Sequence, residues 1–194
     1  MRRLAIIPAR GGSKRLPLKN ILPILGHPLL HWTANAARKS KKISKFYISS
    51  DCQRILKEGE KAGYKSIKRP KELATDTSQS CDSVIHALEE MSCDEDIDIV
   101  VVQHANVATI TTQMIDDCIN ILISNGPRKC SAVVPSHECA EYHPLRAQRL
   151  SEEGLLLPFI DNKKKVSANR QDLPTAIFFD HSFWVLWSSS IKNT

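Results

Sequence analysis

The segment IIPARGGSKRLPLKN, residues 6–20, places a glycine pair among four cations directly after a short apolar run. The run Leu4–Pro8 predicts a buried strand, and Gly11 and Gly12 would let the backbone turn sharply and bring its N–H groups close to an anion. The glycine spacing fits neither the G-x-x-x-x-G-K-S/T phosphate loop nor the G-x-G-x-x-G dinucleotide motif. The segment therefore predicts a loop that binds nucleotide phosphate, with a basic surface loop and nucleic-acid binding as the alternatives.

Positive charge is concentrated at the start of the chain. Residues 1–45 contain eleven Lys and Arg residues and no Asp or Glu, and Asp51 is the first acid. A field of one sign attracts anions such as a nucleoside triphosphate or a nucleic acid. RNA binding normally adds an aromatic stacking surface, whereas aromatic residues make up only 6% of this chain. The charge pattern therefore favours a nucleotide, and we expect no nucleic-acid partner.

Length and composition predict one globular domain over residues 1–194, because the 194 residues are 42% hydrophobic. No apolar run approaches the roughly 20 residues of a membrane span, and the start lacks the apolar stretch of a secretory signal. We therefore expect a cytoplasmic protein without a membrane partner, or a nuclear one if its source is an animal. The six cysteines contain no C-x-x-C pair, which predicts reduced thiols.

Strand and helix patterns alternate along the first two thirds of the chain. The expected strands are Leu4–Pro8, Ile43–Ser49, Asp98–Gln103 and Ser131–Pro135. The expected helices are Pro28–Arg38, Gln53–Ala62, Ser78–Glu90 and Thr112–Ser124. This order predicts an α/β fold with a mostly parallel sheet between two layers of helices. Ligands of such sheets bind at the carboxyl ends of the strands, where the loop at residues 9–20 begins.

Five ordered segments carry a resemblance to a known family. Besides the loop at 6–20, they are KRPKELATDTSQS (68–80), VVQ (101–103), EYHP (141–144) and NRQDLP (169–174). Together they resemble the acylneuraminate cytidylyltransferases, also called CMP-sialic acid or CMP-nonulosonic acid synthetases, and more loosely the Kdo cytidylyltransferases. The resemblance implies a Rossmann-like nucleotidyltransferase fold and a homodimer. It also implies that residues 136–175 form a small dimerisation lobe that reaches over the partner's site.

The chemistry that the resemblance implies is a transfer of CMP. The anomeric hydroxyl of a nine-carbon 2-keto sugar acid attacks the α-phosphate of CTP, pyrophosphate leaves, and Mg²⁺ assists. Positioning and charge neutralisation dominate such reactions. Lys19 and Arg10 are the implied catalytic residues. The implied nucleotide-binding residues are Arg10, Gly11, Gly12, Ser13, Lys14, Lys19, Asn20, Arg69 and Ser80. The implied sugar-binding residues are Gln103, Arg146, Arg170 and Gln171.

Three of the motif residues also have structural interpretations. Arg69 precedes a proline and could close a loop, while Asp76 is expected to cap the following helix rather than to contact a ligand. His143 is interpreted as a hydrogen-bonded structural histidine rather than as an acid or base.

The chain departs from the family pattern in three places. HANVATI (104–110) stands where the family has P-T-S-P-x-R, so the sugar is not predicted. His181 stands where the family has a glycine, which predicts strain if that position has positive φ. No acid follows Asp180, whereas the family has a D-x-D pair there that binds Mg²⁺, so the protein ligands of the metal are unknown. The alternative function is therefore a shortened or catalytically impaired member that acts as a CTP-binding or scaffolding subunit.

Overall fold

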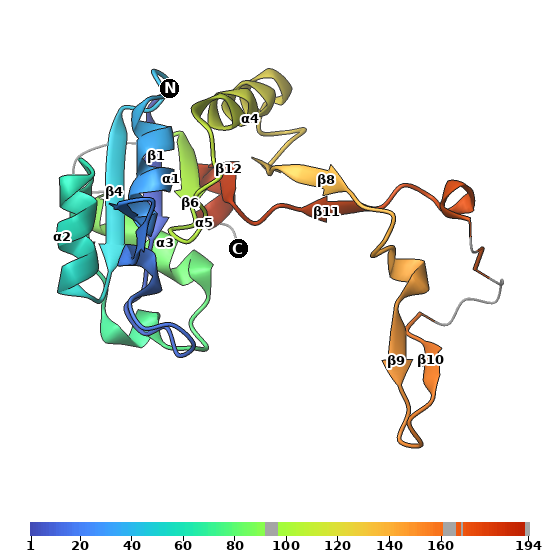
Figure 1. The fold of residues 1–194 in the computed structure, drawn as a ribbon. Helices are drawn as coiled ribbons and strands as arrows, with labels where there is room; N and C mark the ends of the chain where they lie inside the picture. Colours follow the sequence, from blue (N-terminus) through green and yellow to red (C-terminus); the bar gives the residue numbers. More distant parts are fainter. Residues whose placement is uncertain (92–96, 161–165, 168, 193–194) are drawn as a thin grey trace. The chain divides into compact units, whose positions relative to one another are not determined.

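The computed structural model describes residues 1–91, 97–160, 166–167 and 169–192. The chain divides into two compact units (Figure 1). Unit 1 consists of Met1–Pro135 and His181–Thr194, and unit 2 of Ser136–Asp180. The lobe predicted at 136–175 falls within unit 2, and its role stays a prediction.

Unit 1 is built on a six-stranded sheet with the order β5-β4-β1-β6-β12-β7. The first four of these strands run parallel, whereas β12 runs antiparallel to both β6 and β7. The predicted α/β fold with a mostly parallel sheet is confirmed. The strands are β1 (Arg3–Pro8), β4 (Lys45–Ser50), β5 (Lys65–Lys68), β6 (Ile99–Gln103), β7 (Ala132–Val133) and β12 (Phe183–Trp187).

Helices cover both faces of this sheet, because the strands are apolar on both sides. On β1, Ala5 and Ile7 belong to one buried cluster, and Leu4 and Ile6 belong to the other. The first cluster receives side chains from α1 (Leu29–Arg38), α2 (Gln53–Lys61) and α4 (Thr112–Asn125). The second receives side chains from α3 (Ser80–Met91) and α5 (Ser188–Lys192). Both faces of β1 and β6 are therefore buried, and the carboxyl ends of the parallel strands meet at one edge.

Each of the eight predicted elements is present, with ends shifted by one or two residues in most cases. Two strands of the sheet were not predicted. β5 has a single buried residue, Ile67, and therefore no apolar pattern. β12 pairs with β6 in a register that joins Phe183 to Gln103, and no local pattern indicates so distant a partner.

Helix α2 packs against β4 through a glycine. A Cβ atom added to Gly59 would lie 2.5 Å from Cγ2 of the fully buried Ile48. We expect Gly59→Ala to lower the free energy of unfolding by about 1 kcal/mol, since overpacking costs about 1–3 kcal/mol and helix propensity returns at most about 1 kcal/mol. Urea denaturation measures this change, with Lys57→Ala on the exposed face of α2 as the control. An unchanged or higher midpoint for Gly59→Ala would contradict the packing.

Unit 2 consists of two short antiparallel pairs and two 3-10 turns. β8 (Ser136–Glu138) pairs with β11 (Ile177–Phe179), and β9 (Gln148–Leu150) pairs with β10 (Leu156–Pro158). The 3-10 turns are η3 (Pro144–Arg146) and η4 (Arg170–Asp172). His143 is the only buried residue among those that the structure describes in this unit. Unit 2 therefore has no apolar core of its own.

Two further findings concern the described part of the chain. None of its helices has the length and hydrophobicity that a membrane crossing requires. Its five cysteines, Cys52, Cys81, Cys118, Cys130 and Cys139, are free thiols, and Cys93 lies outside the described residues.

Candidate functional site

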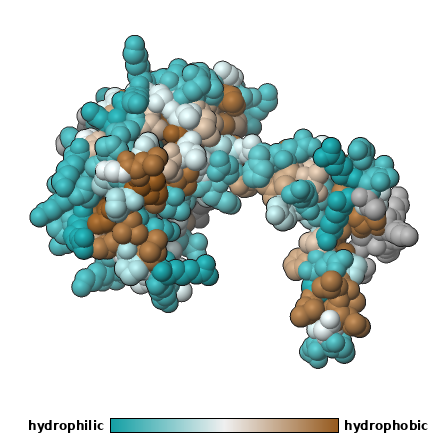
Figure 2. Space-filling view, in the orientation of Figure 1, coloured by the Kyte–Doolittle hydropathy of each residue, from teal (hydrophilic) through white to brown (hydrophobic). Residues whose placement is uncertain are grey.

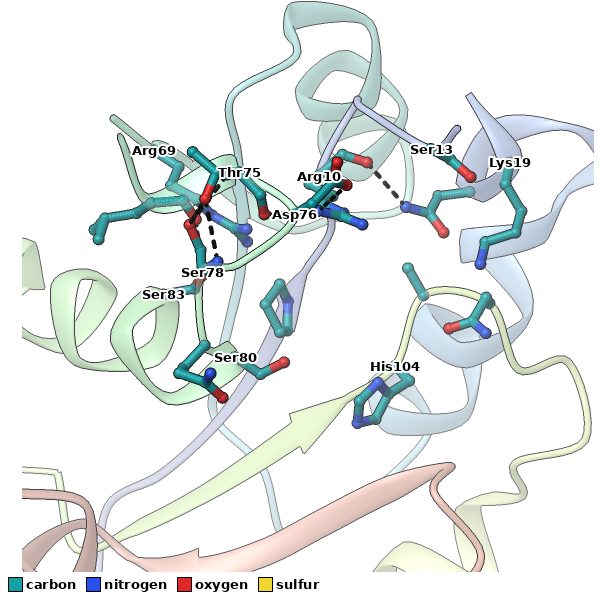
Figure 3. A pocket seen from close by; sticks show the side chains of 16 residues that line it. Arg10, Ser13, Lys19, Arg69, Thr75, Asp76, Ser78, Ser80, Ser83 and His104 are labelled. Atoms are coloured by element: carbon teal, nitrogen blue, oxygen red, sulfur yellow. Dashed lines mark hydrogen bonds and ion pairs between the residues drawn. The ribbon is translucent and has the colours of Figure 1, made fainter. Parts of the chain in front are cut away.

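A cavity of about 300 Å³ lies in unit 1 at the carboxyl ends of β1 and β6 (Figure 3). The loop after β1 forms one wall, the residues after β6 form another, and the segment from Arg69 to Ser83 forms a third. The lining residues are Pro8, Arg10, Ser13, Lys19, Asn20, Arg69, Leu73, Thr75, Asp76, Ser78, Gln79, Ser80, Ser83, His104, Ala105 and Asn106.

Most of the predicted nucleotide-binding side chains meet in this cavity. They are Arg10, Ser13, Lys19, Asn20, Arg69 and Ser80. Lys14 lines a neighbouring open depression together with Gly12 and Ser13. Gly11 lines neither hollow.

The two glycines of the loop differ in their surroundings, and the phosphate-binding role of Gly12 stays a prediction. The N–H of Gly11 donates to Oδ1 of Asp51 at 2.8 Å, so it is not available to a phosphate. A Cβ atom on Gly11 would lie 2.7 Å from Cβ of Cys52, which is why this position has no side chain. Gly12 has no positive φ and open space around its Cα. Gly11 therefore fixes the loop against the end of β4, and the cations provide the charge.

Lys19 enters the cavity from a strained turn. Leu18 has φ of 54°, a conformation uncommon for a residue with a side chain, and it begins the 3-10 turn η1 (Lys19–Ile21). Asn20, next in this turn, is buried and donates from Nδ2 to the carbonyl of Arg10 at 3.3 Å. Within the described residues the Lys19 ammonium has no hydrogen-bond or ion-pair partner, and it points into the cavity in Figure 3. Lys19 is therefore a cation ready for an anionic ligand.

Arg69 both closes a loop and lines the cavity. It is only 5% exposed, and its guanidinium donates to Oγ of Ser49 at 3.1 Å and to the Ser49 carbonyl at 2.8 Å. Burial lowers the pKa of Arg69, while Asp51 acts in the opposite direction. Because an arginine side chain stays protonated in proteins, Arg69 is a fixed buried cation.

Asp76 does not play the predicted part of a helix cap. Its carboxylate pairs with Nη1 of Arg10 at 3.0 Å (Figure 3). It also pairs with Nζ of Lys14 at 2.5 Å. Arg10 also donates to the Thr75 carbonyl at 2.7 Å. The hydrogen bond from Lys14, with the charges of Lys14 and Arg10, lowers the pKa of Asp76. Asp76 therefore holds two of the predicted phosphate-binding cations in the free protein.

Gln103 and His104, consecutive at the end of β6, lie in different surroundings. Gln103 is fully buried, donates from Nε2 to the Thr33 carbonyl at 2.7 Å and accepts from the Tyr64 hydroxyl at 2.8 Å. It lies in the core, and the predicted sugar contact has no support from its position. His104 lines the cavity instead, and its backbone N–H donates to the Ser182 carbonyl at 3.0 Å. Its place directly after a buried parallel strand is the signal that could have identified it.

The remaining predicted residues lie in unit 2 or beside it. Arg170 and Gln171 are exposed in η4, Arg146 ends η3, and their sugar contacts stay predictions. His143 accepts at Nδ1 from the N–H of Leu145 at 3.2 Å, so Nε2 carries the proton and donates to the Pro174 carbonyl at 2.9 Å. Its structural interpretation is confirmed. His181 does not have positive φ, so the backbone strain that was predicted for that case does not arise.

Comparison with known proteins identifies the family of the chain. The family model described as Cytidylyltransferase matches residues 4–169. The pseudaminic acid cytidylyltransferase of Campylobacter jejuni (strain 81-176) is 32% identical over 178 residues, which cover 91% of this chain and 74% of that protein. The 3-deoxy-manno-octulosonate cytidylyltransferase of Bdellovibrio bacteriovorus is 27% identical over 92% of this chain and 62% of its own length. The chain therefore belongs to the cytidylyltransferase family, and the predicted resemblance is confirmed.

A solved structure agrees with the fold. The chain is similar to CMP:2-keto-3-deoxy-manno-octonic acid synthetase complexed with CTP, with a TM-score of 0.74 and 16% identity over 100% of this chain and 77% of the other. At this identity the likeness shows the fold. The predicted nucleotidyltransferase architecture is confirmed by it.

Proposed function

We propose that this chain transfers CMP from CTP to the anomeric hydroxyl of a nonulosonic acid of the sialic or pseudaminic type and releases pyrophosphate. The observation that carries the proposal is the meeting of three cations, Arg10, Lys19 and Arg69, in one cavity at the carboxyl ends of the sheet. Membership of the cytidylyltransferase family gives the reaction class. The similar pseudaminic acid cytidylyltransferase gives the acceptor class.

The three cations act on the triphosphate by charge neutralisation. Nucleotidyl transfer spreads negative charge over the α-phosphate and the leaving pyrophosphate, and fixed cations in a cavity stabilise that charge without reorganising. Lys19 and Arg10 take the catalytic roles because both line the cavity from the loop after β1. Ser13, Asn20 and Ser80 are neutral hydrogen-bonding groups for the nucleotide.

The donor set of the cavity fits a Mg²⁺ ion that arrives with the triphosphate. Asp76 is the only carboxylate among the described lining residues, and the described residues hold no group of three metal-ligating side chains. Mg²⁺ in nucleotide sites commonly uses one or two carboxylates together with substrate phosphates and water. Asp76 would thus supply the protein ligand, and the ion would add to the neutralisation of the leaving pyrophosphate.

A homodimer would cover the exposed apolar surface of unit 2. Figure 2 shows hydrophobic surface over the β9–β10 hairpin. Five large apolar side chains of the unit are at least 60% exposed: Leu150, Leu155, Leu156, Phe159 and Phe179. Isolated two-stranded hairpins are marginally stable in water, so this unit needs a covering surface. We propose that a second copy of the chain covers this surface. We also propose a cytoplasmic location.

Product formation with a panel of acceptors tests the proposal. The purified chain is incubated with CTP, Mg²⁺ and one acceptor at a time: pseudaminic acid, N-acetylneuraminic acid, legionaminic acid or Kdo. The expected result is a CMP-sugar of the correct mass with at least one acceptor. The scaffolding alternative instead predicts CTP binding without product, and binding of oligonucleotides in place of CTP would support the nucleic-acid alternative.

Replacement of Asp76 by Asn is expected to tighten CTP binding severalfold in metal-free buffer. In the free protein the Asp76 carboxylate forms ion pairs with Arg10 and Lys14. The triphosphate must displace this carboxylate in order to bind the two cations. Isothermal titration with EDTA present measures the affinity. Glu72→Gln is the matched control because it removes the same charge from the same exposed segment outside the cavity. Unchanged or weaker binding by Asp76→Asn would show that the ion pairs do not oppose the nucleotide.

A further inference from the structure

We propose that His104 is the general base of the transfer reaction and takes the proton from the acceptor hydroxyl as this oxygen attacks the α-phosphorus of CTP. This inference rests on the proposed function. In the step, a bond forms between the hydroxyl oxygen and the α-phosphorus, and the bond from the α-phosphorus to the bridging oxygen of pyrophosphate breaks. Pyrophosphate leaves with that electron pair, and the hydroxyl proton moves to a ring nitrogen of His104.

The other ionisable groups of the cavity are poor proton acceptors. Arg10, Lys19 and Arg69 are cations and have no free electron pair to offer. Asp76 is an ionised carboxylate tied to two cations, and its lowered pKa makes it a weak base. His104 is the remaining ionisable side chain among the described lining residues. Imidazole is the side chain used most often for this purpose.

The structure holds His104 in place from the neighbouring strand. Its backbone N–H donates to the Ser182 carbonyl at 3.0 Å, and its ring meets the Trp184 ring edge to face with centroids 6.3 Å apart. In Figure 3 the ring lies across the cavity from Arg10 and Asp76. The acceptor sugar can approach the α-phosphate from the side of the cavity opposite the phosphate-binding cations, and a base on that side can contact its hydroxyl.

The surroundings of His104 favour the neutral ring that a base requires. Burial lowers its pKa, and the nearby His181 lowers it further. The partners from β12 and the turn before it, Trp184 and Ser182, are uncharged. Across the cavity lie the cations Arg10, Lys19 and Arg69, with Asp76 as the single anion. Because only the neutral ring accepts a proton, activity should fall as the pH decreases through a value below the ordinary histidine pKa of about 6.5.

The test is the pH profile of kcat/KM for pyrophosphate release, measured with the acceptor that gives product in the panel. For His104→Ala we expect kcat to fall by about 10²–10⁴ and the acid limb of the profile to disappear, with CTP affinity retained. Added imidazole should restore part of the rate. His27→Ala is the matched control, since His27 makes the same edge-to-face contact with Trp32, at 5.9 Å, outside the cavity. It should keep the wild-type rate and profile.

His181→Gln tests the same idea without altering the base. Removal of its repulsion should raise the pKa of His104 and move the acid limb to higher pH. An unaltered acid limb in both His104→Ala and His181→Gln would overturn the role of His104 and leave the proposed function intact. Absence of pyrophosphate release by the wild-type chain with every acceptor would overturn the proposed function, and this inference with it.

Discussion

Lys19→Ala is expected to lower kcat for pyrophosphate release by about 10²–10³, the usual loss when one fixed charge-stabilising group is removed from a transition state. Lys19 lines the cavity, and within the described residues its ammonium has no partner to satisfy in the free protein. Truncation of Lys19 therefore removes an interaction with the ligand and none within the described part of the protein. The free energy of unfolding should stay nearly unchanged. Steady-state kinetics with saturating CTP and a urea denaturation curve measure the two quantities.

Lys41→Ala is the control for this prediction, because it removes an equal charge from an exposed position outside the cavity. Lys19→Arg separates charge from shape, since arginine keeps the charge but changes its geometry. We expect Lys41→Ala to match the wild type and Lys19→Arg to lie between the wild type and Lys19→Ala. A Lys19→Ala rate within twofold of the wild type would exclude Lys19 from the charge stabilisation.

Gly11→Ala is expected to lower kcat/KM by about 10², because a displacement of reacting groups of about 1 Å can have this effect. The added Cβ would lie 2.7 Å from Cβ of Cys52, so the loop that carries Arg10 and Lys19 must move. The shift also disturbs the 2.8 Å hydrogen bond from Gly11 to Asp51. Steady-state kinetics measure the loss, and CTP titration shows how much of it is binding.

Two variants show whether the loss comes from this close approach. Gly12→Ala should have little effect, because nothing lies within 4 Å of its added Cβ and its φ is not positive. Cys52→Gly removes the opposing Cβ and, combined with Gly11→Ala, should recover activity relative to Gly11→Ala alone. Equal losses for Gly11→Ala and Gly12→Ala would contradict the contact with Cys52.

The sequence predicts the central parallel strands of the sheet well, and the edge strand β5 and the antiparallel strand β12 poorly. β6 is apolar on both faces and lies between helices, which is the pattern of a central parallel strand. β12 is equally apolar, yet its register with β6 joins residues about eighty positions apart, and a local pattern carries no such information.

The sequence predicts which cations reach the site, because their placement follows from charge and position in the chain. It does not predict contacts between two loops. The cations of residues 10–19 follow strand β1, so their gathering at its carboxyl end follows from the topology. The pairing of Asp76 with Arg10 joins two loops, and no sequence spacing indicates that they approach each other.

The buried position of Gln103 could have been predicted from the sequence. Gln103 continues the alternation of Ile99 and Val101, two residues of one buried cluster. That period of two predicts an inward side chain.

The most direct test of the account is the rate of pyrophosphate release from CTP with and without an acceptor. The purified chain is given CTP, Mg²⁺ and pseudaminic acid, the acceptor named for the similar Campylobacter jejuni enzyme, with parallel reactions that lack the acceptor or contain EDTA. The account predicts equimolar pyrophosphate and CMP-sugar in the complete reaction, and neither when acceptor or metal is omitted. Binding of CTP without pyrophosphate release, for pseudaminic acid and for each other acceptor of the panel, would contradict it.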